Sequence, residues 1–333
     1  MAPGTTRRIV DLSFPAPDPK RYAGKVDLTE VLVTDWHPEG EHTDAVTVRW
    51  PCRHAFYTPG PHPDYGLLLF AESVRQSLAV TCHLGLGVPM GHRMGWETLT
   101  STVRPDAMSI GTEPATVDLT IHHEDVERRK SGLVRLTARV RATRDGMPLG
   151  TAEVRYTAYP PALYDRLRGP YADAREAFAR SLPPGPAIDP ALVGRTDPRD
   201  VVLTADPADP AQGATGAPRR WLLRTDTTHP VLFDHPHDHV PGMVLLEAVS
   251  QAARAAAPRD TVPIAFDTSF HRYVEFDLPC AIVADEPEVD EWGRRRQRVD
   301  GLQDGRTVFT AVVTSVDRGD QSAVRARQYQ IVA

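Results

Sequence analysis

One pattern of polar residues occurs twice in this 333-residue chain, and the two copies are a constant 175 residues apart. The matched pairs are His54/His229, Pro61/Pro236, His62/His237, Glu72/Glu247 and Gln76/Gln251. Weaker matches at a spacing of 174 residues pair Val88-Pro89 with Val262-Pro263 and Pro105 with Pro279. Self-similarity at a fixed period indicates repeated structural units. We therefore expect two duplicated domains, and the length suits two units of about 150 residues.

Each half contains one segment that is apolar on most of its circumference. These segments predict helices over about 66–84 and 242–256. A surface helix carries only an apolar stripe, so both helices are expected to be buried on nearly all sides.

Short β-branched runs precede each helix, and segments of alternating apolar and polar residues follow it. The expected strands are 31–33, 45–48, 115–126, 133–143 and 151–159 in the first half, and 201–203, 221–223, 264–276, 281–289, 295–302, 307–316 and 324–332 in the second. Such alternation is typical of half-exposed antiparallel strands, and Asp145-Gly146 and Asp304-Gly305 predict hairpin turns. The predicted class is α+β, a tandem (double) hot-dog fold. In each half a long antiparallel sheet wraps around one central helix, and the halves pack as a pseudo-dimer.

The boundaries between these units follow from composition. We expect an N-terminal extension over 1–24, a first hot-dog domain over 25–162 and a second over 199–333. Between them, 163–198 is expected to hold a connecting helix at about 164–180 followed by linker. The stretch 182–218, dense in Pro, Gly and Asp, is typical of a linker that contains one strand.

Charge and cysteine usage narrow the class of protein. The net charge is −6, which argues against a nucleic-acid partner because phosphate backbones attract basic surfaces. The scattered Cys52, Cys82 and Cys280 form no disulfide framework, so a cytoplasmic location is expected. The first residues lack the apolar stretch of a signal peptide, and no apolar run approaches the roughly 20 residues of a membrane span.

Glu72 and Glu247 lie inside the two apolar helices, four residues before a glutamine in each case. Burying a carboxylate is costly unless it is paired or used. One interpretation is structural, with Glu72 paired to Arg75. The favoured interpretation is catalytic, because burial would raise the pKa of such a carboxyl group toward the range of a general base.

Histidines gather just before the second helix. The segment 229–242 holds four histidines and two aspartates. It is interpreted as an active-site loop, with a structural loop or a metal site as alternatives; interleaved prolines and the lack of a helical pair of histidines argue against metal, and no metal ligand is predicted. The step Pro241-Gly242 leaves the backbone N–H groups of Gly242 and Met243 free to hold a thioester oxygen and the oxyanion formed from it.

The two helices differ in their basic residues. Arg75 precedes Gln76 and is expected either to pair with Glu72 or to bind phosphate. Ser250 takes the matching position in the second helix, and Arg254 lies one turn further on as a substitute. The repeated polar residues are also expected at the substrate: His54, His229, Gln76 and Gln251.

No Gly-x-Ser-x-Gly elbow, P-loop or dinucleotide fingerprint is found, and no cysteine lies in a shared motif. A direct transfer without a covalent acyl-enzyme is therefore favoured.

The segment 233–248, FDHPHDHVPGMVLLEA, resembles the helix start of 3-hydroxyacyl-carrier-protein dehydratases, which carry a histidine before a Pro-Gly step and a glutamate on the helix. The resemblance implies catalytic roles for His237 and His239. More closely, the chain resembles the A-factor biosynthesis (AfsA) family over about 25–333. The stretches that carry this resemblance are WPCRH at 50–54, LLFAESVRQ at 68–76, HPVLFDHP at 229–236, DHVPGM at 238–243 and SFHRYVEFDLPC at 269–280.

The AfsA resemblance implies an acyltransferase that moves a β-ketoacyl group from acyl carrier protein to the hydroxyl of dihydroxyacetone phosphate. That ester leads to a small bacterial signalling molecule, a γ-butyrolactone, butenolide or furan, that controls antibiotic production. The resemblance carries over Glu72, Arg75 and Glu247, with Glu72 or Glu247 as the base, and implies no cofactor. Ser250 departs from the family's usual arginine. Two alternatives are another hot-dog enzyme, a dehydratase or thioesterase, and a non-catalytic protein that binds acyl ligands. Whether the fused unit works as a monomeric pseudo-dimer or as a homodimer stays open.

Overall fold

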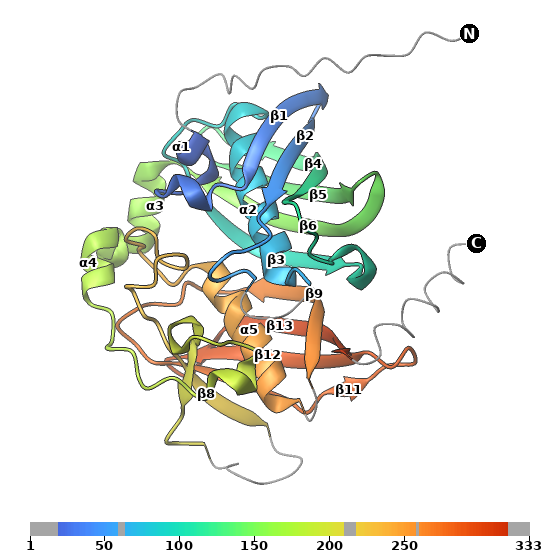
Figure 1. The fold of residues 1–333 in the computed structure, drawn as a ribbon. Helices are drawn as coiled ribbons and strands as arrows, with labels where there is room; N and C mark the ends of the chain where they lie inside the picture. Colours follow the sequence, from blue (N-terminus) through green and yellow to red (C-terminus); the bar gives the residue numbers. More distant parts are fainter. Residues whose placement is uncertain (1–18, 59–63, 210–217, 258–259, 319–333) are drawn as a thin grey trace, which may run out of the picture.

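The computed structural model describes residues 19–58, 64–209, 218–257 and 260–318. In Figure 1 the first half, in blue and green, lies above the second half, in yellow to red, and one helix runs through each half. The expected pairs at Pro61 and His62 and the expected strand 324–332 lie outside the described residues.

The described strands form one antiparallel sheet in the order β1-β2-β4-β5-β6-β3-β9-β13-β12-β10-β8-β7, with β11 paired to β12. Their bounds are β1 Val33–Gly40, β2 Thr43–Trp50, β3 Arg93–Val103, β4 Ala115–Arg128, β5 Val134–Arg144, β6 Met147–Tyr159, β7 Leu203–Ala205, β8 Arg219–Leu223, β9 Thr261–Phe270, β10 Cys280–Ala284, β11 Glu288–Val289, β12 Arg295–Gln303 and β13 Arg306–Asp317. The tandem hot-dog prediction is confirmed: each half curves its own part of the sheet around one helix.

The two central helices are α2 (Leu67–Leu84) and α5 (Gly242–Ala256), close to the predicted bounds. Fifteen of the 18 residues of α2 are buried, as the apolar circumference predicted. The two helices contact each other across the interface between the halves. None of the helices in the described part of the chain is long and apolar enough to cross a membrane.

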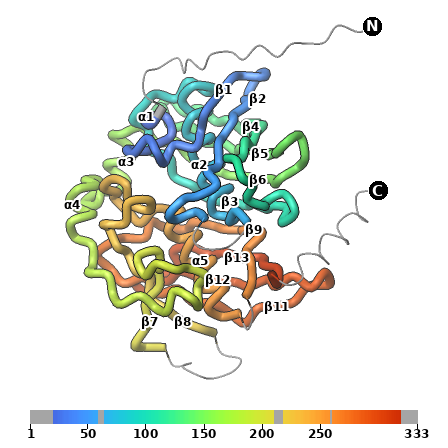
Figure 2. Tube along the Cα trace, in the orientation of Figure 1, coloured from blue at the N-terminus to red at the C-terminus, as the bar shows by residue number. Residues whose placement is uncertain are grey.

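The halves are joined by β3 and β9, the two strands at the middle of the sheet. Leu99 pairs with Thr268 and Ser101 with Phe266, so hydrogen bonds run without a break from one half to the other. Figure 2 shows the two halves meeting at these strands. The residue pattern predicts no strand at β3, because apolar and polar residues do not alternate clearly over its first residues.

Three other expectations need correction. The predicted helix 164–180 is broken at Gly169-Pro170 into α3 (Pro161–Arg168), a 3-10 turn and α4 (Ala174–Ala179), since proline removes a backbone donor and disfavours the helical conformation before it. The predicted strand 281–289 is two strands, β10 and β11. The weaker match of Val88-Pro89 to Val262-Pro263 is not structural, because the first pair precedes β3 whereas the second lies within β9.

Gly150 tests the packing of the strand that joins the halves. A Cβ at Gly150 would lie 2.4 Å from the backbone oxygen of Thr102 in β3, and a backbone cannot swing aside as a side chain can. We expect Gly150→Ala to lower the free energy of unfolding by about 1–3 kcal/mol, as overpacking does. Gly40→Ala is the control because a Cβ there meets nothing within 4 Å. Equal urea midpoints for the two variants would contradict this account of β3.

Candidate active site

Glu72 lies on α2, and only 1% of its surface is exposed. Arg75, one turn on, donates two hydrogen bonds of 2.8 Å, from Nε to Oε2 and from Nη2 to Oε1. Gln76 donates a third, from Nε2 to Oε1 at 2.8 Å. The ammonium group of Lys25 lies 3.2 Å from Oε1. The buried carboxylate is therefore paired, which meets the cost of its burial.

These contacts overturn one expectation. Burial by itself would raise the pKa of Glu72, but the charges of Arg75 and Lys25, together with hydrogen bonds from Arg75 and Gln76, lower it from 4.5 to about 2. The predicted rise of this pKa is therefore wrong. Glu72 is a carboxylate that is charged at neutral pH and contacts two cations.

Glu247 on α5 is held in a related way by a residue from outside the helix. Arg195 approaches Oε1 with Nε at 2.8 Å and Nη2 at 2.6 Å, and Gln251 donates to the same oxygen at 2.6 Å. The remaining nitrogen of Arg195, Nη1, donates to the backbone oxygen of Phe56, and the guanidinium stacks on the Phe56 ring at 4.2 Å. The side chain of Arg195 is 9% exposed, so this site is closed.

Ser250 takes no part in that arrangement, because its hydroxyl donates to the backbone oxygen of Leu246. The sequence offered Arg254 as the substitute for an arginine here, whereas Arg195 makes the contact with Glu247. Burial lowers the pKa of Arg254 to about 10, although the negative charge of Glu247 acts in the opposite direction.

Arg195 and Lys25 are equivalent in a part of the repeat that the sequence comparison missed. Residues 24–32, here called the first strap, match residues 194–202, the second strap, at a spacing of 170. Gly24 and Gly194 both have positive φ, 65° and 68°, which favours glycine. In each strap the next residue is basic and pairs with the helix glutamate of its own half. The match was missed because the spacing changes from 170 to 175 between the strap and the histidine of each half.

The repeated glutamines attach each strap to its helix. Gln76 accepts from the backbone nitrogen of Leu32 at 2.8 Å and donates to the backbone oxygen of Glu30 at 2.8 Å. Gln251 accepts from Val202 at 2.9 Å and donates to the oxygen of Asp200 at 2.8 Å. The equal contact sets confirm that the two halves are structural copies.

The repeated histidines fasten the loop before each helix. Nε2 of His54 lies 3.1 Å from the carboxylate of Glu30, and Nε2 of His229 lies 3.0 Å from that of Asp200. Each Nδ1 accepts from two backbone N–H groups of its own loop. With Nδ1 accepting, Nε2 is the nitrogen of each ring that donates toward the carboxylate. Both ring nitrogens serve the chain itself, and a role at the substrate stays a prediction for His54, His229, Gln76 and Gln251.

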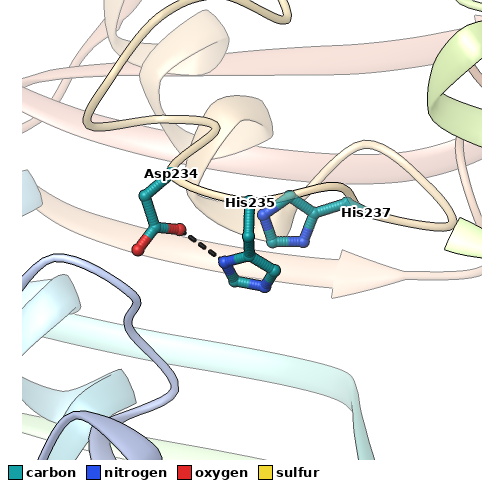
Figure 3. A group of neighbouring side chains, drawn as sticks. All are labelled: Asp234, His235 and His237. Atoms are coloured by element: carbon teal, nitrogen blue, oxygen red, sulfur yellow. Dashed lines mark hydrogen bonds and ion pairs between the residues drawn. The ribbon is translucent and has the colours of Figure 1, made fainter. Parts of the chain in front are cut away.

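The first strap also reaches the other half, at the segment 234–239, here called the histidine loop. The backbone nitrogen of Val26 donates to Oδ2 of Asp234 at 3.0 Å, one residue from the lysine that pairs with Glu72. Nδ1 of His235 lies 2.6 Å from Oδ1 of Asp234, the contact drawn in Figure 3. Burial opposes the ionisation of Asp234, but bonds from His235 and Val26 and the charge of Lys25 lower its pKa to about 2. The site at Glu72 is thus built from both halves.

His237 lies beside this pair, its ring centroid 4.2 Å from that of His235. Burial, and the charges of His235, His239 and Arg75, lower the pKa of His237 to about 3, so the ring is neutral. Metal-ligating atoms of Asp234, His235 and His237 lie within 4.8 Å of one another. Two imidazoles and a carboxylate are a donor set that divalent transition metals accept. From the sequence, a metal site is only an alternative interpretation and no metal ligand is predicted.

His239 belongs to a separate network that holds the histidine loop in place. Nδ1 of His239 lies 3.1 Å from Asp238, whose carboxylate also accepts from Arg168 at 2.7 Å and from Tyr164 at 2.8 Å. Arg168 is 5% exposed and also pairs with Glu275. Because Arg168 and Tyr164 belong to α3, the connecting segment fixes the position of the loop.

The start of α5 completes the surroundings of the histidine loop. Pro241 is the N-cap residue, and no side chain caps the helix. In any α-helix the N–H groups of the first turn have no acceptor within the helix. Here these groups include those of Gly242 and Met243. The predicted oxyanion position therefore has donors to offer.

Two hollows on the described surface lie away from both glutamates. One, of about 710 Å³, lies on the sheet and is bordered by residues such as Thr100, Arg141 and Asp267. The other, of about 170 Å³, is bordered by residues such as Leu182 and Phe276. Solvent reaches the Glu72 site past Arg75 and His235, whose side chains are 25% and 36% exposed.

A family model described as the A-factor biosynthesis hotdog domain matches residues 10–160 and 179–318. The match covers both halves and both glutamate-bearing helices. The chain belongs to the A-factor biosynthesis family. The resemblance seen in the sequence is thereby confirmed.

Relatives in the A-factor biosynthesis family extend over most of the chain. A 2-oxo-3-(phosphooxy)propyl 3-oxoalkanoate synthase of Streptomyces virginiae is 37% identical, with 89% of this chain and 96% of the relative aligned. A protein of the same name from Streptomyces coelicolor is 34% identical, over 90% of this chain and 91% of the relative. Among solved structures, an acyl-ACP thioesterase from Bacteroides thetaiotaomicron aligns with 81% of this chain and 97% of its own, at 11% identity and a TM-score of 0.47.

Sequence reasoning brought forward Glu72, Arg75 and the histidine loop but missed Lys25 and Arg195. Lys25 had a signal, because only three lysines occur in the chain and this one stands after a repeated glycine. Asp234 and His235 stood in the histidine-rich segment but were not singled out, since only the fold shows which ring faces the other half.

Glu72→Gln tests the paired carboxylate. It keeps the shape of the side chain but leaves Lys25 and Arg75 without their buried counter-charge, so we expect a loss of about 3–5 kcal/mol at pH 7. A carboxyl group whose pKa is lowered on folding stabilises above its unfolded pKa, near 4.5, and the contribution is lost as the pH falls toward the folded pKa of about 2. The difference between wild type and variant in urea unfolding should therefore shrink from pH 5 to pH 3.

The control for this measurement is Glu41→Gln, at an exposed position of the β1–β2 turn. It should change the unfolding free energy by less than about 0.5 kcal/mol at either pH. A Glu72→Gln effect that is absent at pH 7, or unchanged at pH 3, would contradict the ion-pair account.

Proposed function

We propose that this protein is an acyltransferase that moves a β-ketoacyl group from acyl carrier protein to a hydroxyl of dihydroxyacetone phosphate. The product is the phosphorylated keto ester that gives its relatives their name. The proposal is carried by one observation: the first strap brings Lys25 to Glu72 and Arg75 and, through the next residue, touches the histidine loop of the other half. Groups suited to an anion and groups suited to a proton thus lie together.

The phosphate would bind at Lys25 and Arg75. Glu72 occupies Nε and Nη2 of Arg75, while the side chain stays 25% exposed, so Nη1 remains for an anion. A guanidinium held by a buried carboxylate is oriented before the ligand arrives, and less side-chain entropy is lost on binding. Glu72 therefore acts by positioning, without itself moving a proton.

The thioester would lie at the start of α5. The free N–H groups of Gly242 and Met243 lie at the positive end of the helix dipole, where the negative charge of the tetrahedral intermediate is stabilised.

The closed Glu247 site is proposed to be structural. All three nitrogens of Arg195 contact the chain itself, and Glu247 accepts from Arg195 and Gln251. The catalytic role predicted for Glu247 and the substrate role predicted for Arg254 would require this arrangement to open, whereas the side chain of Arg75 at the Glu72 site is 25% exposed as it stands.

A second candidate is a thioesterase or dehydratase. Such an enzyme would share the fold, but its reaction would not need the two cations Lys25 and Arg75, here called the cationic pair. Hydrolysis needs no site for a phosphorylated acceptor, and Lys25 and Arg75 beside an oriented carboxylate would then have no ligand. The cationic pair is the specific observation that favours transfer.

We further propose a cytoplasmic location, where carrier-bound acyl groups are available. The described cysteines are free thiols, and burial raises the pKa of Cys82 to about 11 and of Cys280 to about 12, so both are unreactive. One copy holds both halves of the Glu72 site, so a second copy is not required for activity.

The decisive experiment mixes the purified protein with β-ketoacyl carrier protein and dihydroxyacetone phosphate. We expect the phosphorylated ester by mass spectrometry and free carrier thiol in equal amount. Free fatty acid formed at the same rate without the acceptor would show a thioesterase, and loss of water from a 3-hydroxyacyl carrier protein would show a dehydratase. Binding of acyl ligands without turnover would show the non-catalytic alternative.

Arg75→Ala should raise the KM for dihydroxyacetone phosphate by about tenfold to a hundredfold. This is the loss of affinity expected when one to two hydrogen bonds to a charged group are removed. The KM for the acyl carrier protein should change little. Arg166→Ala, at an exposed position of α3, is the control. An unchanged KM for the phosphorylated acceptor would remove Arg75 from the phosphate site.

A further inference from the structure

Acyl transfer to a hydroxyl needs one group that first takes a proton and then returns it. The acceptor O–H loses its proton as the oxygen attacks the thioester carbon and the new C–O bond forms. When the intermediate collapses, the C–S bond breaks and the carrier thiolate takes up a proton. One imidazole can perform both steps, because its two protonation states are accessible near neutral pH.

We propose that His235, oriented by Asp234, is this proton carrier, and that the Glu72 site is therefore the one of the two related sites that turns over. The proposal rests on the proposed acyl transfer. Nε2 of His235 takes the proton from the acceptor hydroxyl and gives it to the carrier sulfur. Asp234 is a positioning residue that fixes the ring and stabilises the imidazolium formed between the two steps.

The geometry of His235 suits the task. Nδ1 lies 2.6 Å from Oδ1 of Asp234, so this nitrogen carries the proton and Nε2 presents its lone pair. Within the described residues no hydrogen bond to Nε2 is found, and the side chain is 36% exposed. In Figure 3 the ring projects from the loop toward the side on which the blue elements of the first half lie.

Asp234 is itself held from the first half. Its second oxygen accepts from Val26, the residue after Lys25, and its side chain is only 6% exposed. This bond sets the distance between the proton carrier and the cations proposed to hold the phosphate. The reacting hydroxyl and the phosphate belong to one three-carbon molecule, so base and cations must be neighbours.

The other candidate bases fit less well. Glu72 is bonded to Arg75, Gln76 and Lys25, so no oxygen of this buried carboxylate is presented to a substrate. His237 lacks a carboxylate partner among the described residues. His239 has Asp238 at 3.1 Å, but that aspartate already accepts from Arg168 and Tyr164, which offsets the charge that would stabilise an imidazolium.

The repeat supports the choice of site. At the 175-residue spacing, Asp234 and His235 correspond to Pro59 and Gly60 in the first half. Neither can carry a proton. The site at Glu247 therefore lacks an equivalent of the Asp234-His235 pair, and Arg195 closes that site. The glutamates, glutamines and straps occur in both halves, whereas the Asp234-His235 pair occurs only in the second.

The same three side chains also meet the donor requirements of a metal ion, which would be a different mechanism. The positive charges of Lys25 and Arg75 nearby oppose a divalent cation, and the bond between Asp234 and His235 uses two of the ligand atoms as they stand. These contacts favour His235 as a proton carrier over a metal ligand. A metal-dependent reaction is one of the outcomes that the test distinguishes.

The test measures single-turnover ester formation by the full chain, from β-ketoacyl carrier protein and dihydroxyacetone phosphate. His235→Gln should lower the rate constant by about 100-fold to 10,000-fold, the contribution of a general base, while the KM for dihydroxyacetone phosphate changes less than threefold. Asp234→Asn should lower the rate constant at least tenfold, and Asp234→Glu should recover part of it. His37→Gln, at an exposed position of β1, is the matched control.

Added imidazole should restore part of the activity of His235→Gly, a result that a structural role would not give. This second variant also decides the matter if His235→Gln folds poorly, as judged by its melting temperature against wild type. A His235→Gln enzyme within threefold of wild type, in a preparation that makes the ester, would overturn the proton carrier and leave the acyltransferase intact. Wild-type protein that makes no ester would instead overturn the proposed function.

Dialysis against EDTA separates the metal mechanism. We expect full wild-type activity after dialysis and less than about 0.1 equivalent of zinc, cobalt or manganese bound per chain when each metal is added back and measured by elemental analysis. Lost activity that Zn²⁺, Co²⁺ or Mn²⁺ restores, with binding abolished in His235→Gln and His237→Gln, would overturn the proton-carrier assignment.

Discussion

The buried ion pair between Glu72 and its two cations is the interaction on which the rest of the site depends. A carboxylate in the middle of an apolar helix requires partners, and here they come from two elements: Arg75 and Gln76 from the same helix, and Lys25 from the first strap. Satisfying the carboxylate therefore fixes the strap. Because the next strap residue bonds to Asp234, it also fixes the histidine loop of the other half.

Duplication followed by divergence explains the two sites. The straps, glutamines and histidines make equal contacts in both halves, so they serve the fold that both copies share. The differences concern charge and closure: an arginine in α2 becomes Ser250 in α5, a lysine becomes Arg195, and the pair Asp234-His235 matches Pro59-Gly60. Arg195 uses its extra donor to contact Phe56 and close one site, whereas at the other site the side chain of Arg75 stays 25% exposed.

Relatives in the A-factor biosynthesis hot-dog family are named synthases of a phosphorylated keto ester. The proposed transfer requires an anion-binding group beside a proton carrier, and a pseudo-dimer can supply one group from each half. The continuous sheet through β3 and β9 holds the halves in a fixed relation. The network around Arg168, which ties α3 to the histidine loop, does the same on the other side.

The sequence by itself determined the duplication, the two buried helices, most strands and the family, because periodicity and repeated spacing are local properties of the chain. It also directed attention to Glu72, Arg75 and the histidine-rich segment. Only the tertiary structure decided that Glu72 is a low-pKa ion-pair centre, that Lys25 pairs with Glu72 as Arg195 pairs with Glu247, and that Asp234 contacts His235. Burial alone argues for a raised pKa, whereas partners distant in sequence reverse its sign, and no local pattern shows which residues those partners are.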